Sequence, residues 1–170
     1  MDTNKLQDEF IASVDKHRSM IHKVCSMYAS AEFDHKDLFQ EIVIQLWRSY
    51  PSFRGDSKFS TWLYRIALNT AISGLRKKRP DLRSMEPSML PQQMQDIPFD
   101  ASQEDKLKQL HLAINQLSEV ERAIVMLYLE DKSYDEMEEI LGINQNNLRV
   151  KMNRIKDRLR KITKTLQYGT

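Results

Sequence analysis

Three asparagines and two arginines lie close together near the C-terminus, within residues 145–154. Asparagine and arginine form paired hydrogen bonds with the edges of adenine and guanine, and a neighbouring valine can contact the methyl group of thymine. On a helix, three of these side chains would point away from the buried side and three would flank it. We therefore predict that this segment reads base edges in the major groove of duplex DNA, through Asn146, Asn147, Arg149, Val150, Asn153 and Arg154.

Two predicted helices and the turn between them would carry these side chains, and they have the pattern of a helix-turn-helix. Ser133 and Glu136 fit a capping box at the start of a short helix, Gly142 suits the turn, and Asn144 is a candidate N-cap for a helix over about 145–166. One apolar stripe of the second helix is expected to be buried, and it consists of Leu148, Met152, Ile155 and Leu159. The alternative interpretation is an amphipathic helix whose charged side is merely solvated.

Charge is concentrated in two basic blocks. Residues 54–79 hold seven basic side chains and one acidic, and residues 149–164 hold eight and one. Between them, residues 80–148 hold five basic and fourteen acidic side chains. The blocks indicate two places where a polyanion docks, unless they are solvated helix faces. Outside the predicted base-reading set, the cations expected to contact phosphates or solvent are Lys156, Arg158, Arg160 and Lys161.

The first basic block holds a second candidate site, on a helix predicted over about 58–79. One face of this helix carries Trp62, Arg65, Asn69, Ser73 and Arg76, and it leads into Lys77. An aromatic ring beside cations favours unpaired bases, since bases stack on rings while a basic groove follows the backbone. The alternative is that Trp62 belongs to the core. Two further rings flank the Gly55-Asp56 turn and are expected either to wall a pocket for an extruded base or to hold the loop; they are Phe53 and Phe59.

The whole chain is predicted to be all-α, because glycine is scarce and β-branched alternation is absent. Besides the segments above, helices are expected over about 5–29 and 35–49, with Asp34 as an N-cap and Pro51 as a stop, and a further capping box begins at Ser118. Four prolines and three glutamines mark a flexible acidic linker. The predicted organisation is a helical domain 1–79, a linker 80–101 and a helix-turn-helix domain 102–170.

Catalysis and metal binding find little support in the sequence. The four histidines show no paired ligand spacing, a glycine-rich phosphate loop is absent, and Cys25 is the single cysteine, so we expect a non-enzyme without cofactor, metal or small-molecule substrate. Asp34, His35 and Asp37 are better explained by a helix cap than by a metal cluster. Long apolar runs and a signal peptide are also absent, which predicts a cytoplasmic protein without membrane insertion.

Several of these segments together resemble one protein family. Residues 37–41 (DLFQE), 53–57 (FRGDS) and 61–69 (TWLYRIALN) are similar to the N-terminal module of bacterial RNA polymerase sigma factors of the extracytoplasmic-function (ECF) group. The stretch from Leu117 through Tyr134 and residues 140–143 (ILGI) to Arg149 resembles the second module of that group. The matches follow the order of the family and cover nearly the whole chain.

The resemblance implies a transcription initiation subunit whose partners are core RNA polymerase, promoter DNA and an anti-sigma factor. The helix that begins at the first motif would dock on the polymerase clamp through Asp37, Gln40, Glu41, Ile44 and Gln45. The next loop and helix would read and open the minus-10 element through Lys58, Phe59, Trp62, Arg65, Asn69, Arg76 and Lys77. The six residues of 145–154 named above would read the minus-35 element.

Two other functions stay open on the sequence alone. A stand-alone helix-turn-helix regulator explains the C-terminal half equally well, but it explains neither the Trp62 to Arg76 face nor the acidic linker. A helical adaptor that binds only protein is the third possibility. The sequence also departs from the family at Glu138, where a small residue is usual, and at Ser73, where an acidic residue is common. Gly74 lies in mid-helix with no reason visible in the sequence.

Overall fold

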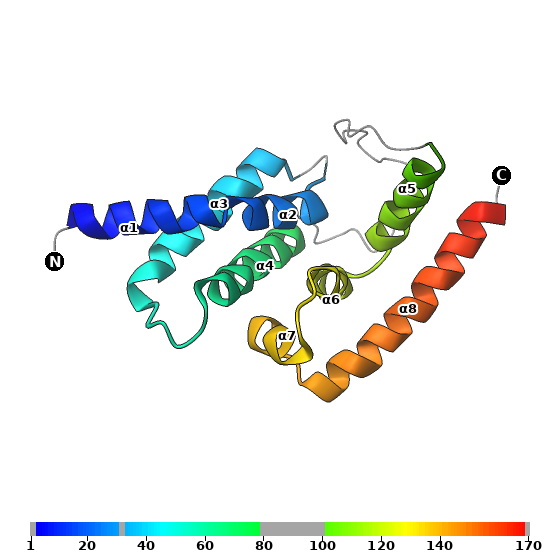
Figure 1. Cartoon of the computed structure of the whole chain (residues 1–170). Coiled ribbons are helices and arrows are strands. Elements are labelled where there is room, and N and C mark those ends of the chain that lie inside the picture. The colour runs from blue at the N-terminus through cyan, green and yellow to red at the C-terminus, as the bar shows by residue number, and fades with distance from the viewer. Residues whose placement is uncertain (1–2, 31–32, 79–100, 169–170) are drawn as a thin grey trace. The chain divides into compact units, whose positions relative to one another are not determined.

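The structure is a computed structural model that describes residues 3–30, 33–78 and 101–168. All regular structure in these residues is helical, as the sequence predicts (Figure 1). The chain divides into two compact units, residues 1–91 and 92–170, and each is described by itself. The predicted linker falls almost entirely on residues 79–100, which lie outside the described part, so the predicted domain bounds stay a prediction.

The N-terminal unit consists of α1 (Thr3–Lys16), α2 (Arg18–Tyr28), α3 (His35–Ser49), the short 3₁₀ helix η1 (Tyr50–Ser52) and α4 (Phe59–Lys78). The Asp34 carboxylate caps α3 by accepting a hydrogen bond from the Lys36 backbone N–H, as predicted. The core of the N-terminal unit comes from all four α-helices. Its largest fully buried side chains include Tyr28, Tyr64, Ile21, Leu38, Ile42, Leu46, Leu63, Leu68 and Leu75.

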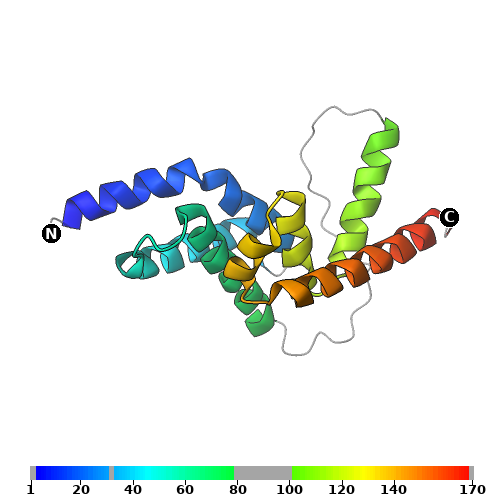
Figure 2. The same cartoon turned by 60° about the horizontal axis from the view of Figure 1, so that its bottom comes forward.

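The prediction of one continuous helix over 5–29 is wrong in one respect, because this segment forms two helices, α1 and α2, that meet at His17. There the backbone leaves helical geometry, with φ −110° and ψ 14°. His17 Nδ1 lies 2.8 Å from the carbonyl oxygen of Ser13, and the Ser13 hydroxyl donates to the carbonyl of Glu9. Such local side-chain bonds compete with the regular helix ladder. The break lets α1 and α2 follow different paths (Figure 2).

Gly74, unexplained by the sequence, is explained by packing. A Cβ atom built on Gly74 would lie 2.8 Å from Cζ of Phe33. Phe33 comes from the segment before α3 and is buried. The ring of Phe33 therefore packs directly against the backbone of α4 at Gly74. Glycine in a helix lowers its stability by about 1 kcal/mol relative to alanine, and the packing of Phe33 offsets this cost.

The C-terminal unit consists of α5 (Ala101–Asn115), α6 (Glu119–Leu129), α7 (Tyr134–Leu141) and α8 (Gln145–Tyr168). Helix α5 begins at the last residue of the predicted linker, and it packs along α8. Both predicted capping boxes are present, at Ser118 and Ser133. All four helices contribute to the core, which includes Ala113, Ile124, Leu127, Met137, Ile140, Leu148, Met152 and Ile155.

Candidate nucleic-acid interface

The predicted helix-turn-helix is formed by α7, the turn at Gly142 and α8. The Ser133 hydroxyl accepts from the Glu136 backbone N–H at 3.1 Å, and the Glu136 carboxylate accepts from the Ser133 N–H at 2.9 Å. Gly142 ends α7 in the left-handed region, at φ 69° and ψ 20°, where a side chain would be strained. Asn144 caps α8 as predicted, since its side-chain oxygen accepts from the Asn146 N–H at 2.9 Å.

Helix α8 turns its predicted reading residues to solvent and its apolar stripe inward. Leu148, Met152 and Ile155 are buried, whereas Leu159 is only half-buried. Val150, the one apolar member of the predicted set, is 49% exposed. We call the exposed set the α8 reading face; it consists of Asn146, Asn147, Arg149, Val150, Asn153 and Arg154.

The cations farther along α8 are partly engaged within the protein. Arg158 Nη1 lies 3.1 Å from the Glu121 carboxylate, and Arg160 pairs with Asp157 at 3.0 Å. Lys156 donates to the Tyr128 hydroxyl at 3.2 Å. Arg158 and Arg160 remain exposed in these ion pairs, so the expectation that these cations contact phosphates or solvent stays a prediction. Lys161 is exposed.

The second candidate surface lies on α4 and the residue before it. Lys58, Trp62, Arg65, Asn69 and Arg76 share one side of the helix, and all except Trp62 are exposed. Phe59 and Lys77 border this side, with Phe59 half-buried and Lys77 exposed. We call these seven residues the α4 face.

Trp62 belongs to an aromatic cluster that extends beyond the predicted residues. Its ring centroid lies 5.0 Å from that of Phe53, 5.2 Å from Phe59 and 6.3 Å from Tyr50. Tyr50 in turn packs against Phe10 of α1 at 5.2 Å. Trp62 is half-buried, so it packs in the cluster and keeps part of its ring open. Tyr50 was not predicted from the sequence, because it lies in a 3₁₀ turn before a proline, where the spacing of apolar residues gives no indication of burial.

Helix α3 presents the residues predicted to bind polymerase. Leu38, Ile42 and Leu46 are buried and fix its rotation. The opposite side, which we call the α3 ridge, consists of Asp37, Gln40, Glu41, Ile44 and Gln45. All are exposed except Gln45, which is half-buried and donates to the Glu41 carboxylate at 2.8 Å.

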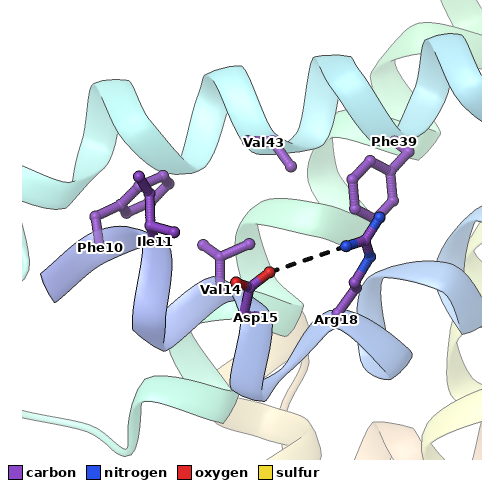
Figure 3. A pocket seen from close by; sticks show the side chains of 7 residues that line it. All are labelled: Phe10, Ile11, Val14, Asp15, Arg18, Phe39 and Val43. Atoms are coloured by element: carbon purple, nitrogen blue, oxygen red, sulfur yellow. Dashed lines mark ion pairs between the residues drawn. The ribbon is translucent and has the colours of Figure 1, made fainter. Parts of the chain in front are cut away.

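A groove runs along each side of the α3 ridge. Figure 3 shows the apolar one, of about 220 Å³, between α3 and the first two helices. The Asp15–Arg18 ion pair, 4.0 Å long, lies on the α1–α2 side of this groove, and Arg18 Cζ lies 5.6 Å from the Phe39 ring centroid. Its lining residues are Phe10, Ile11, Val14, Asp15, Arg18, Phe39 and Val43.

The other groove, of about 570 Å³, is polar and lies between α3 and α4. Asp37, Glu41 and Gln45 line it from the α3 ridge, and Asn69 and Lys77 line it from the α4 face. The sequence assigned these residues to two separate partners, and the fold brings them to one groove. Only tertiary structure could reveal that proximity.

Two titratable groups buried or partly buried in the N-terminal unit have shifted pKa values. Burial raises the pKa of the Cys25 thiol to about 12, which leaves it protonated and unreactive at neutral pH. The pKa of His22 is lowered because its ring is partly buried and because His35 and Arg18 oppose a further positive charge. In the described ranges, no three His, Cys, Asp or Glu side chains are grouped so as to hold a metal ion. The helices of those ranges are too short or too polar to cross a membrane.

Comparison with known proteins supplies one family match for each unit. Residues 14–80 match the family described as Sigma-70 region 2, and residues 107–159 match the family described as Sigma-70, region 4. The first match spans α2, α3 and α4 and contains the whole α4 face. The second contains α6, α7 and the whole α8 reading face.

Two curated relatives match over most of their length. The chain is 31% identical over 166 residues to the ECF RNA polymerase sigma factor SigW of Bacillus subtilis (strain 168), covering 91% of this chain and 89% of that protein. It is 32% identical over 149 residues to the ECF RNA polymerase sigma-E factor of Escherichia coli (strain K12), covering 80% and 78%.

Two solved structures of protein complexes contain a chain with the same fold. One is the sigma factor RpoE in complex with the anti-sigma factor NepR from Bartonella quintana, with a TM-score of 0.66 and 20% identity, covering 95% of this chain and 98% of that one. The other is CnrH in complex with the cytosolic domain of CnrY, with a TM-score of 0.65 and 19% identity, covering 94% and 90%. At this identity the likeness concerns the fold.

Proposed function

Because the chain belongs to the ECF group of sigma-70 factors, which direct promoter-specific transcription initiation by core RNA polymerase, we propose that its two helical units divide promoter recognition between them. The supporting observation is that each unit carries one outward surface suited to a different form of DNA. The proposed division has an N-terminal domain 1–79, a linker 80–101 and a C-terminal domain 102–170.

The α8 reading face binds the minus-35 element as duplex. Its amides and guanidinium groups are exposed on one helix, which follows a capped helix and a left-handed glycine turn. This is the arrangement that places side chains against base edges in the major groove. Val150 supplies the apolar contact that suits a thymine methyl group.

The α4 face binds and opens the minus-10 element. Trp62 and Phe59 offer ring surfaces for bases that leave the duplex, and the exposed cations of α4 hold the phosphates of the separated strand. The adjoining Phe53 packs against both rings. The aromatic cluster thereby fixes the platform before DNA arrives.

The α3 ridge docks on core polymerase. It combines carboxylates and amides with the exposed apolar side chain of Ile44, a mixture typical of protein interfaces. The polar groove beside it is shared with the α4 face, so polymerase and the separated strand meet along α3 and α4. An anti-sigma factor would hold the chain inactive by covering one of these surfaces.

The polymerase supplies the catalysis, and this chain acts as a binding subunit without cofactor or small-molecule substrate. The sigma-70 family is not a family of enzymes. The cytoplasm, where bacterial polymerase meets the chromosome, is its proposed location. A stand-alone regulator is not favoured, because it accounts for the C-terminal unit only and leaves the match over residues 14–80 without a role.

The test is run-off transcription with purified chain and sigma-free bacterial core polymerase. Promoter-specific transcripts should appear only when both are present, and the promoter is found by selecting DNA bound by the reconstituted holoenzyme. Specific DNA binding by the chain alone, with no effect on core polymerase, would indicate a regulator instead. Failure to bind core polymerase would overturn the proposal.

A further inference from the structure

The ring of Tyr134 lies against the guanidinium group of Arg149. Arg149 Cζ is 4.9 Å from the ring centroid, within the roughly 6 Å over which a ring face attracts a cation. Tyr134 is the first residue of α7 and is half-buried, whereas Arg149 is exposed on the α8 reading face. The contact therefore joins the first helix of the helix-turn-helix to a side chain predicted to read DNA.

The position of this ring is fixed by α7. The capping box of Ser133 and Glu136 holds the helix start directly beside it. The next residue, Asp135, accepts a hydrogen bond from Gln145 Nε2 at 3.2 Å. The first turns of α7 and α8 are thus tied together next to the Tyr134–Arg149 contact, which holds the backbone that carries the ring.

The contact holds the guanidinium without using its hydrogen-bond donors. A ring face occupies none of the five N–H donors of arginine. One nitrogen of Arg149, Nη1, donates to the Asn146 side-chain oxygen in a long hydrogen bond of 3.4 Å. Arg158 and Arg160 of the same helix are instead paired with carboxylates. Among the described residues, none places a carboxylate within ion-pair distance of Arg149.

We propose that Tyr134 is a positioning residue for duplex recognition. Its ring holds the Arg149 guanidinium in one orientation before DNA binds, and so sets the discrimination at the base pair that Arg149 contacts. The inference rests on the proposed function, which assigns Arg149 to the minus-35 element. It adds a residue outside the α8 reading face that determines specificity without touching a base.

The experiment uses holoenzyme reconstituted from the full chain and a set of promoters substituted at each upstream position. Arg149→Ala identifies the base pair at which discrimination depends on Arg149. Tyr134→Leu should lower discrimination at that base pair about two- to fivefold, the equivalent of an exposed cation–ring contact. Discrimination at the other positions should stay unchanged. Tyr134→Phe keeps the ring and should behave as wild type.

A matched control is available on the same helix. Lys156 Nζ lies 4.6 Å from the ring centroid of Tyr128, so Tyr128→Leu removes a similar contact away from the α8 reading face and should leave discrimination unchanged. In the Arg149→Ala background, Tyr134→Leu should have no further effect. If thermal melting shows that Tyr134→Leu is destabilised, Tyr134→Gln replaces it, since glutamine lacks the ring but suits a helix.

Three results with the Tyr134 variants would overturn the inference. The first is a Tyr134→Leu effect on discrimination that persists when Arg149 is replaced by alanine. The second is a loss of discrimination in Tyr134→Phe equal to that in Tyr134→Leu, which would indicate a phosphate contact by the hydroxyl. The third is unchanged discrimination in Tyr134→Leu. Unchanged discrimination in Arg149→Ala would remove the premise about Arg149 and the inference with it. Absence of promoter-specific initiation by wild-type holoenzyme would instead overturn the proposed function.

Discussion

The α4 face and the α8 reading face differ in how deeply they are built into the fold. On α4, Trp62 and Phe59 are half-buried and belong to an aromatic cluster that reaches Tyr50 and Phe10. On α8, all six side chains are exposed, and the buried stripe of Leu148, Met152 and Ile155 lies on the other side of the helix. Recognition and packing therefore overlap in the first surface and are separate in the second.

This difference matches the two forms of DNA that we assign to them. A base that has left the duplex offers an apolar face, which needs a preformed ring platform anchored in the fold. A base inside the duplex offers only its edge, which needs slender polar side chains on an exposed helix. We therefore expect substitutions of Trp62 and Phe59 to affect stability and DNA opening together, and substitutions in the α8 reading face to affect mainly binding.

The largest effect is expected for Trp62→Ala. Loss of the ring should destabilise the open complex by about 1 to 3 kcal/mol for each stacked base, and it should lower the free energy of unfolding by about 1 to 2 kcal/mol because part of the ring is buried. Permanganate reactivity of unpaired thymines measures opening, and thermal melting measures stability.

The control for this substitution is Trp62→Phe, which should recover most of the opening because it restores a ring. Association with core polymerase should be intact in both variants. If Trp62→Ala and Arg149→Ala lost core binding equally, the proposed separation of recognition from folding would be wrong.

The next effect is expected for Arg149→Ala. It should weaken upstream binding by about 1 to 3 kcal/mol if the guanidinium contacts a base. It should lower thermal stability only slightly, because the side chain is exposed and its contact with the Tyr134 ring lies at the surface. Titration of holoenzyme with promoter fragments, beside melting of the free chain, tests both statements. A clear drop in melting temperature would erase the contrast between the two surfaces.

A smaller effect separates two arginines of α8. Arg154→Gln should lower the salt dependence of DNA binding by about one counterion, because an exposed cation that reads a base in the groove also displaces a counterion from the phosphates beside it. Arg158→Gln should leave the salt slope unchanged and cost up to about 1 kcal/mol of stability, because Arg158 forms an exposed ion pair with Glu121. DNA binding measured at several salt concentrations distinguishes the two variants. Identical salt slopes would refute the prediction that Arg154 contacts DNA and that Arg158 does not.

The smallest effect concerns pH and the N-terminal unit. Since the native pKa of His22 lies below the ordinary 6.5, the unfolded chain binds more protons as the pH falls through that value, and stability decreases. The decrease should begin near pH 6.5 and end below the native pKa. Urea unfolding followed by tryptophan fluorescence reports on this unit, because the two tryptophans, Trp47 and Trp62, both lie in it. His22→Asn should remove this part of the pH dependence.

Features fixed by neighbouring residues could be predicted from the sequence. The capping boxes at Ser118 and Ser133, the N-caps at Asp34 and Asn144, and the outward side of α8 all depend on spacings within a helical turn or two. These features are sufficient to define the helix-turn-helix and its exposed polar residues.

Features that join distant segments could not be predicted. The packing of Phe33 on Gly74 and the groove shared by Glu41 and Asn69 exist only after α3 and α4 have packed together. The break at His17 escaped detection for another reason, since the apolar spacing runs through it without interruption. The structure does not explain why Glu138 replaces the small residue that is usual in the family; its side chain is half-buried.

The buried thiol of Cys25 makes the native protein suitable for site-directed labelling. Maleimide reagents attack thiolates, and a thiol with a pKa of about 12 supplies almost none at neutral pH. A cysteine introduced on the surface of each unit would therefore take up a fluorophore while Cys25 stays unmodified. The distance between the units could then be followed by energy transfer as the chain associates with polymerase and with promoter.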